Sequence, residues 1–441
     1  MARIFRPSTF NKLKPLLQQP FAKPSFNIIQ PRYIRPRYAM AFSTARSAAL
    51  PFFNPKTLLD LQQSISNQTH VSTALATHLL SNNLPESNIA FSPLSLHSIL
   101  SLLANGSKGQ TLDQLLAFLK ADTIDELNSL YSELVSLILA DGGPNGGPLL
   151  SFVTGVWVEK TLSIKPSFQQ VVDTVYNGAC NQADFMNKAS EVVNDVNLWA
   201  KNKTNGLINE VLRDNDVGNL TRLIIANAVY FKGAWSQKFE ESCTKESDFH
   251  LLDGNKVQVP FMTNRKTQFV QEYDDFKVLG LPYLQGQDKR KFTMYFFLPN
   301  AKDGLQSLIE KIGSTPDFFN HHIPREKVEV GRFLIPKFKI SSGFKASDIF
   351  EELGLDISDF SEMVNRERLY LCDIHHKAFV DVNEKGTEAA AVSIAVSVGS
   401  SYMTITKEKV DFVADHPFLF MIREEMTGAV FFIGHVINPS V

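Results

Sequence analysis

Residues 379–418 read FVDVNEKGTEAAAVSIAVSVGSSYMTITKEKVDFVADHPF. Up to Val382 this stretch alternates like a β-strand, and after Gly386 two alternating sets continue with a period of two. One set has only small side chains: Thr387, Ala389, Ala391, Ser393, Ala395 and Ser397. The other set becomes β-branched and apolar: Glu388, Ala390, Val392, Ile394, Val396 and Val398. The pattern predicts a strand whose small face can slide beneath other structure.

The same strand pattern ends in Gly399-Ser400-Ser401, a tripeptide typical of an accessible loop tip. A strand-forming segment carried as a loop is an aggregation hazard, so its presence calls for a functional reason. Gly386, directly before the small residues, is suited to act as a hinge. The stretch therefore favours a loop that becomes a strand.

The chain before this stretch predicts a helix-rich start. Apolar residues follow helical spacing from about Thr57 through Leu80, where the folded domain begins. Residues 88–91 predict a short buried strand, and Ser92 is an N-cap with proline at the next position. The helix that follows is expected to end at Gly106.

Further elements are expected between this helix and the C-terminus. Thr111, with a glutamine three residues later, predicts a capping box for the next helix. Residues 223–231 are a continuous apolar strand interrupted only by Asn227, and Trp235 follows it. Other strands are predicted at 149–158, 257–262, 295–299 and 332–340.

Several of these motifs, in this order, resemble the serpin family. Glu384-Lys385-Gly386-Thr387-Glu388 with three alanines resembles the start of the serpin reactive-centre loop. The segments around Trp199 and Asn227, and Asp415-His416-Pro417-Phe418, match further family motifs. The resemblance spans residues 57–441, and the motif string looks most like the plant Z-type serpins. It implies a single α+β fold with three β-sheets, about eight to nine helices and an exposed reactive-centre loop at about 384–411.

The resemblance also assigns roles to individual residues. The implied hinge consists of Glu384, Gly386, Thr387, Glu388, Ala389, Ala390, Ala391 and Val392. A cluster that holds the central sheet closed is expected from Ser92, Ser95, Asn227 and His375, and Trp235 is expected where the loop enters the sheet.

The reactive bond follows from the family's spacing. Counting from Gly386 places it between Ser400 and Ser401, with Tyr402 or Met403 as the anchor if the register moves. The plant subgroup usually carries Leu-Arg at this bond. This chain has Gly399-Ser400 in place of Leu-Arg, so trypsin-like specificity is not expected here.

Two functions remain open on this resemblance. One is a suicide-substrate inhibitor of serine endopeptidases, and of cysteine endopeptidases as an extension. The other is a non-inhibitory serpin with a storage, carrier or chaperone-like role. Non-inhibitory relatives often carry charged, bulky or proline residues in the hinge, whereas this chain keeps small residues and has no proline through Val398, which favours inhibition. The expected partner is an elastase-like or chymotrypsin-like serine protease, or a cysteine protease, and the protein is expected to be monomeric.

Composition argues against other classes. The net charge of −2 gives no reason to expect nucleic acid, and no apolar run of about 18 residues suggests a membrane span. The three cysteines lie far apart without metal-ligand spacing and read as free or buried thiols. The adjacent pairs His321-His322 and His375-His376 form no zinc-binding pattern, and the sequence contains no nucleophile or phosphate-binding motif. Neither an enzyme nor a metal or other cofactor is therefore expected.

The N-terminus has a different character from the rest. Residues 1–59 contain no Asp or Glu, while Arg and Lys recur throughout. This composition is typical of organellar transit peptides, so residues 1–56 are expected to direct the protein to a mitochondrion or plastid. Two alternatives remain: a start at Met40 that leaves the protein in the cytoplasm, and an extracellular location.

Overall fold

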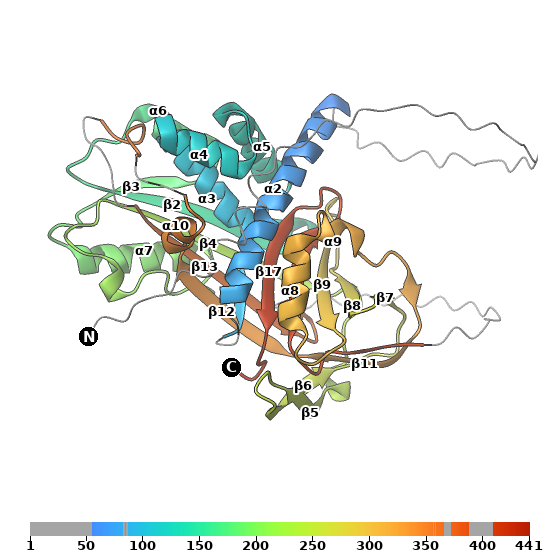
Figure 1. Cartoon of the computed structure of the whole chain (residues 1–441). Helices are drawn as coiled ribbons and strands as arrows, with labels where there is room; N and C mark the ends of the chain where they lie inside the picture. The colour runs from blue at the N-terminus through green and yellow to red at the C-terminus, as the bar shows by residue number, and fades with distance from the viewer. Residues whose placement is uncertain are drawn as a thin grey trace, which may run out of the picture. The chain divides into compact units, whose positions relative to one another are not determined.

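A computed structural model describes residues 55–82, 84, 87–355, 357, 359–365, 372–387 and 409–441. Residues Asp60–Val441 form one compact unit, separate from Met1–Leu59. The described residues contain nine α-helices and three sheets, so the predicted α+β class is confirmed (Figure 1). The helices are α2 (Pro55–Asn82), α3 (Pro93–Gly106), α4 (Gly109–Leu119), α5 (Ile124–Leu137), α6 (Pro166–Thr174), α7 (Ala189–Lys203), α8 (Leu305–Ser314), α9 (Phe318–His321) and α10 (Ala346–Glu352).

The six-stranded sheet positions the site. Its order is β12 (Phe338–Lys345), β13 (Cys372–Asn383), β14 (Gly386–Thr387), β4 (Leu223–Ala234), β2 (Leu149–Glu159) and β3 (Ala179–Ala183). Residues 372–379 of β13 pair in parallel with residues 223–230 of β4, and β14 lies between the two strands beyond that point. Helix α7 packs on one face of β2 and β4 through Val192, Val193 and Val196. Strand β4 is a nearly continuous hydrophobic run and is buried along most of its length because both of its faces are covered.

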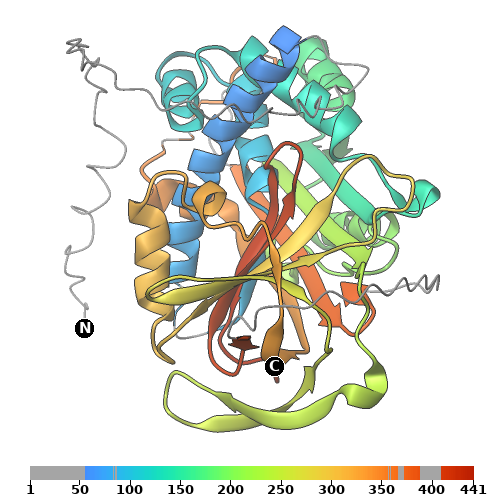
Figure 2. The same cartoon turned by 90° about the vertical axis from the view of Figure 1, so that its right-hand side faces the viewer.

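Two further sheets complete the unit. The seven-stranded sheet has the order β1 (Ile89–Phe91), β17 (Val430–Val436), β16 (Phe418–Glu424), β9 (Phe292–Pro299), β8 (Phe276–Pro282), β7 (Gln268–Glu272) and β10 (Lys327–Val328). The four-stranded sheet has the order β15 (Val410–Val413), β11 (Val330–Pro336), β6 (Lys256–Met262) and β5 (Lys245–His250). In Figure 2 the yellow-green β5–β6 hairpin lies at the opposite end of the unit from the cyan helices α4 and α5.

Local sequence signals explain the start of α3. Ser92 is the N-cap, and its side chain accepts a hydrogen bond from the backbone N–H of Ser95, as predicted. All but one of the helix residues are buried, because α3 passes through the core rather than along the surface. Gly106 is its last residue, which confirms the predicted end.

Two sequence predictions about element boundaries are wrong. The helix after α3 begins at Gly109 with Lys108 as its N-cap, so Thr111 is the third helical residue, is buried, and caps nothing. The single strand predicted at 332–340 is two strands, β11 and β12, which belong to different sheets. The chain changes sheets at Lys337, a change that hydrophobic periodicity does not report.

Candidate functional site

The short strand β14 occupies a gap at one end of the six-stranded sheet. Gly386 and Thr387 pair antiparallel with Asn383 and Val382 of β13 on one side, and with Ala234 and Gly233 of β4 on the other. A Cβ atom at Gly386 would lie 1.9 Å from the backbone oxygen of Gly233, so the close approach of the two strands requires glycine. The predicted pivot is thus the first residue of a strand already placed in the sheet.

Glu384, just before the pivot, is held from three directions. Its carboxylate accepts a hydrogen bond from Thr244 Oγ1 at 2.8 Å and pairs with Lys337 Nζ at 3.0 Å. Its backbone oxygen accepts from the N–H of Phe239 at 3.0 Å. Burial raises the pKa of this carboxyl, but backbone, Thr244 and Lys337 interactions outweigh burial and lower the pKa overall. Glu384 is therefore an ionised, buried anchor for the segment that leads into β14.

Aromatic side chains close the mouth of the gap. Trp235 stacks on Tyr283 with ring centroids 4.6 Å apart, and its Nε1–H donates to the backbone oxygen of Asn383 at 2.8 Å. The hydroxyls of Tyr283 and Thr387 lie 2.6 Å apart, and both side chains are buried. Trp235, predicted to lie where the loop enters the sheet, contacts Asn383 at the end of β13. Tyr283 adds a direct contact to the hinge.

A buried polar cluster lies beneath the paired part of β4 and β13. Asn227 accepts a hydrogen bond from the Ser95 hydroxyl and donates to Thr154 Oγ1 at 3.0 Å. The backbone N–H of Ser92 donates to Nε2 of His376 at 3.1 Å, and Ser95 Oγ lies 3.5 Å from Nδ1 of the same ring. The cluster links helix α3 to three neighbouring strands of the sheet.

The histidine of this cluster is His376, and the prediction of His375 in that place is wrong. Successive strand residues face opposite sides of a sheet, and His376 is the residue opposite Asn227 in the pairing of β13 with β4. His375 is opposite Ala226, on the face covered by α7, and its Nε2 is buried without a hydrogen-bond partner among the described residues. Burial lowers the pKa of His375, and burial lowers that of His376 to about 3. The identical neighbours gave no sequence signal to choose between them. Strand register decides.

The predicted hinge continues into residues that fall outside the described part of the chain. Glu388, Ala389, Ala390, Ala391 and Val392 do so, as do both residues of the predicted reactive bond, Ser400 and Ser401. On the far side the chain is described again from residue 409, and β15 pairs in parallel with β11. The intervening segment is thus tethered at one end to the six-stranded sheet and at the other to the four-stranded sheet.

Sequence reasoning missed four residues that shape the site: Thr154, Thr244, Tyr283 and Lys337. Each comes from a segment distant in sequence from the hinge or cluster residue that it contacts. Within the described ranges, no three or more His, Cys, Asp or Glu side chains are arranged to hold a metal ion. No helix in the same ranges is long and apolar enough to cross a membrane.

Comparison with known proteins gives a consistent result. The family model described as Serpin (serine protease inhibitor) matches residues 66–439. Serpin-ZX of Arabidopsis thaliana is 53% identical over 391 residues, which cover 86% of this chain and all of that protein. Serpin-ZXA of Oryza sativa subsp. japonica is 48% identical and covers 86% of this chain and 98% of that protein. A solved structure of Arabidopsis AtSerpin1 in its native stressed conformation superposes with a TM-score of 0.80 at 51% identity, covering 86% of this chain and 99% of that one.

Proposed function

Because this chain belongs to the serpin family, and within it to the plant Z-type serpins, we propose that it is a suicide-substrate inhibitor of serine endopeptidases, and of cysteine endopeptidases as an extension. The chain has the serpin protease-inhibitor fold. The observation that carries the proposal is the position of β14. Its two residues form the beginning of a strand that the following loop can extend.

The pairing of β14 fixes where each later residue would go. Thr387 is opposite Gly233 on β4 and Val382 on β13, and an antiparallel strand moves one residue back on each neighbour per step. If the strand continued in this register, residue 397 would lie opposite Leu223 of β4 and Cys372 of β13. These are the first residues of the two strands, and they already lie opposite each other in the parallel pairing of β4 with β13. The pairing of β14 with β4 and its pairing with β13 therefore agree on one continuous strand of ten further residues, 388–397.

The same register assigns each alternating set of the loop to a face. Val392, Ile394 and Val396 would lie opposite Ala228, Ala226 and Ile224, residues that pack under α7. The small set, from Ala389 to Ser397, would take the opposite face, where Asn227 contacts α3. Apolar residues would therefore enter the core beneath α7, and small residues would enter the crowded side. The alternation of the loop would thus place apolar side chains toward α7 and small side chains toward α3.

Insertion is expected to be strongly favourable once the loop is cut. The parallel pairing of β4 with β13 over residues 223–230 would be replaced by two antiparallel pairings. The net gain is about one ladder of ten pairs, or on the order of 10 kcal/mol at about 1 kcal/mol for each pair. Before cleavage both ends of the loop are tethered, so the native state is a kinetically trapped one.

The protease is expected to be trapped during catalysis. Its nucleophile attacks the carbonyl carbon of the reactive bond, the amine on the far side leaves, and an acyl-enzyme joins the protease to the cut loop. Insertion of the loop from Thr387 to the cut would then carry the protease roughly 45 Å at about 3.3 Å per residue. Distortion of the protease active site prevents water from completing hydrolysis.

We place the reactive bond at Ser400-Ser401 by the spacing from Gly386. A small, uncharged Ser400 suits a shallow apolar pocket of elastase type, with Val398 and Val396 making contacts upstream. Cleavage after Tyr402 or Met403 would instead favour chymotrypsin-like enzymes.

The test is to incubate the protein with elastase-like, chymotrypsin-like and cysteine proteases and look for SDS-resistant one-to-one complexes. Mass spectrometry of the released C-terminal peptide then locates the cut. A complex with a cut at Ser400-Ser401 supports the proposal in full. Cleavage into two fragments by every protease, without a complex or a gain in thermal stability, would overturn inhibition in favour of the non-inhibitory alternative.

We also propose that residues 1–56 direct the protein to a mitochondrion or plastid, on the strength of their acid-free, basic composition. A fluorescent protein fused to residues 1–56 is expected to enter the organelle, and the same fusion begun at Met40 is expected to remain in the cytoplasm. Cytoplasmic or secreted fluorescence from the full fusion would contradict this assignment.

A further inference from the structure

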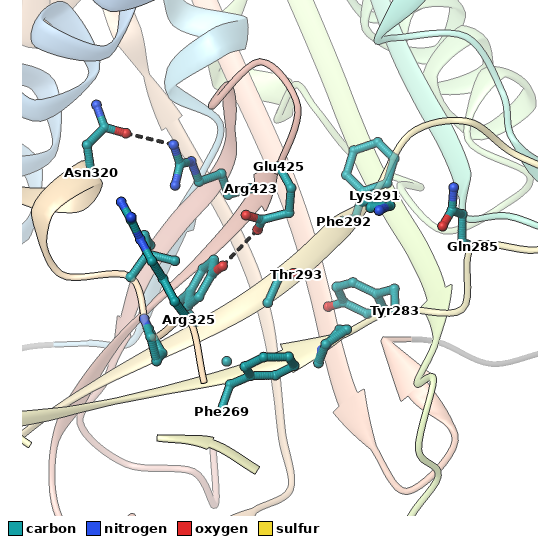
Figure 3. A pocket seen from close by; sticks show the side chains of 15 residues that line it. Phe269, Tyr283, Gln285, Lys291, Phe292, Thr293, Asn320, Arg325, Arg423 and Glu425 are labelled. Carbon is teal, nitrogen blue, oxygen red and sulfur yellow. Dashed lines mark hydrogen bonds between the residues drawn. The ribbon is translucent and has the colours of Figure 1, made fainter. Parts of the chain in front are cut away.

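A small acidic cavity lies between helix α7 and β3, the last strand of the six-stranded sheet. Its volume of about 300 Å³ is at the lower end of the range of about 300–1,000 Å³ that holds small-molecule ligands in proteins. A larger cavity over β8 and β9 has basic side chains, Arg325 and Arg423, on one side (Figure 3). The smaller cavity has the opposite charge, since three carboxylates and one ammonium line it: Asp184, Glu191, Asp195 and Lys188.

Two tryptophans form the apolar wall of the acidic cavity. Trp157 of β2 is buried and Trp199 of α7 is half-buried, and their rings meet edge to face with centroids 5.0 Å apart. Gly155 makes room for this pair, because a Cβ atom there would collide with the Trp157 ring and lie 3.1 Å from Cζ2 of Trp199. Among side-chain rings, indole attracts cations most strongly. The wall is therefore suited to a ligand that is flat or apolar and positively charged.

One carboxylate of the acidic cavity is left without a partner. Asp184 pairs with Lys160 at 2.6 Å, and Glu191 pairs with Lys188 at 2.7 Å. Glu191 raises the pKa of Lys188, and the other two carboxylates of the cavity add to that effect. Asp195 is exposed and has no hydrogen-bond or ion-pair partner among the described residues. Two ammoniums thus compensate two of the three carboxylates, and one negative charge remains.

The unpaired carboxylate and the aromatic wall lie side by side. Asp195 and Trp199 are four residues apart on α7, so their side chains share one face of the helix. Asn181 lies opposite Trp157 in the pairing of β3 with β2 and lines the same cavity. Its amide oxygen adds a neutral acceptor on the side of the cavity away from the helix.

We propose that the acidic cavity binds an organic monocation that carries a guanidinium group. A guanidinium is planar, so its N–H groups can bond a carboxylate in pairs while its face stacks on an indole ring. Asp195 would accept the paired hydrogen bonds, Trp199 would supply the ring, and Asn181 would accept from a remaining N–H. An ammonium fits these groups less well, because it is a compact, strongly hydrated charge without a flat face.

The probe is n-butylguanidinium, and n-butylurea of nearly the same shape is the uncharged control. Calorimetry and tryptophan fluorescence on the full-length protein follow both titrations. We expect saturable one-to-one binding of the cation with a Kd on the order of 1 mM, as suits so few atoms, and at least tenfold weaker binding of the urea.

The guanidinium can come from a free small molecule or from an arginine side chain, and an acetylated and amidated Gly-Arg-Gly tripeptide distinguishes the two sources. Tighter binding of the tripeptide than of butylguanidinium assigns the site to an arginine side chain of a polypeptide. Equal or weaker binding of the tripeptide assigns it to a free small cation.

Two variants have opposite expected effects. Asp195→Asn removes the unpaired charge at an exposed position and should weaken binding of butylguanidinium about tenfold, since it removes a charge-assisted hydrogen bond. Lys188→Gln removes the competing ammonium and should strengthen binding about threefold, because Glu191 becomes available to the ligand. The matched variant Asp173→Asn, an exposed aspartate on α6 outside the cavity, should bind as the wild type does. Thermal midpoints check that each variant is folded.

These measurements use no protease, so they stand apart from the proposed function. Absence of saturation at tens of millimolar probe, equal affinity for butylguanidinium and butylurea, or wild-type affinity in a folded Asp195→Asn protein overturns the site. Weaker binding in Lys188→Gln also overturns it, because a competing cation cannot assist the ligand.

Discussion

Thr387→Arg is the sharpest test of insertion from this hinge. Thr387 is fully buried, its hydroxyl contacts Tyr283, and its strand lies between β13 and β4. An arginine at this position would have to bury a guanidinium beside the Tyr283 ring and the Gly233 backbone, or else leave the gap. The residue would also lie at the start of the inserted strand, so every later pair depends on it.

The magnitude follows from these contacts. Loss of the hydroxyl contact costs about 1 kcal/mol, and burial of an unpaired charge costs several kcal/mol more. If about 3 kcal/mol of this cost is added to the activation free energy of insertion, insertion slows on the order of 100-fold. Hydrolysis of the acyl-enzyme by the protease is unchanged. Deacylation should therefore overtake trapping, and the variant should behave as a substrate.

The assay is the stoichiometry of inhibition, obtained by titrating a fixed amount of a susceptible protease and separating complex from cleaved inhibitor on an SDS gel. Thr387→Ser keeps the hydroxyl and should remain close to wild type. Lys385→Arg places an arginine on an exposed side chain two residues away and should also remain an inhibitor. Circular dichroism and the thermal midpoint check that each variant is folded. A folded Thr387→Arg protein with wild-type stoichiometry would refute insertion from this hinge.

Three further changes address the closed sheet and its anchor. Asn227→Ala or His376→Ala should cause polymerisation or spontaneous loop insertion on prolonged mild heating, because each leaves partners in the buried cluster unsatisfied at about 1–3 kcal/mol. Size-exclusion chromatography checks this, with His375→Ala as the comparison. Variants that stay monomeric and active would contradict the expectation. Glu384→Lys should be more severe, since it removes a buried carboxylate that bonds Thr244 and sets a second cation against the partly exposed Lys337, at a cost of about 1–3 kcal/mol. Glu384→Gln should fall between Glu384→Lys and wild type in the half-time of monomer loss, and equal half-times would exclude an anchoring role. The third change is in pH. Burial lowers the pKa of His376 to about 3 in the folded protein, whereas an unfolded histidine has a pKa of about 6.5. Below pH 6.5 the unfolded state therefore binds a proton that the folded state does not, and the free energy of unfolding falls as the pH drops. Between pH 7 and 5 the difference in unfolding free energy between wild type and His376→Asn should shrink by about 2 kcal/mol, and a pH-independent difference would contradict burial of the neutral ring.

Much of the fold could be predicted from sequence because its signals are local. The N-cap at Ser92 and the apolar run from Leu223 lie in single segments, so neighbouring residues carry the information. The change of sheet at Lys337 could not be predicted in this way. Its two strands read as one extended run, and only their partners in different sheets separate them.

The candidate site shows the same division. Gly386 and Thr387 could be found from their own stretch because a pivot followed by small residues is a sequence pattern. Tyr283 could not be found, since its contact with Thr387 joins residues 104 positions apart. The choice of His376 over His375 depends on the register between β13 and β4, which a pair of identical residues does not reveal.

The proposed insertion would bring one residue of the loop, Ser393, to the buried polar cluster. In the register set by β14, Ser393 would lie opposite both Asn227 and His376, which are partners of each other in the closed sheet. Both side chains contact the Ser95 hydroxyl, so separating the two strands would pull apart a shared contact, and a buried group left without a partner costs about 1–3 kcal/mol. A serine can donate one hydrogen bond and accept others, whereas the alanines before it can do neither. Under the proposed insertion, the hydroxyl at residue 393 would therefore fall where the inserting strand meets the polar cluster, and it could supply a hydrogen-bond partner to Asn227 or His376 in the opened sheet.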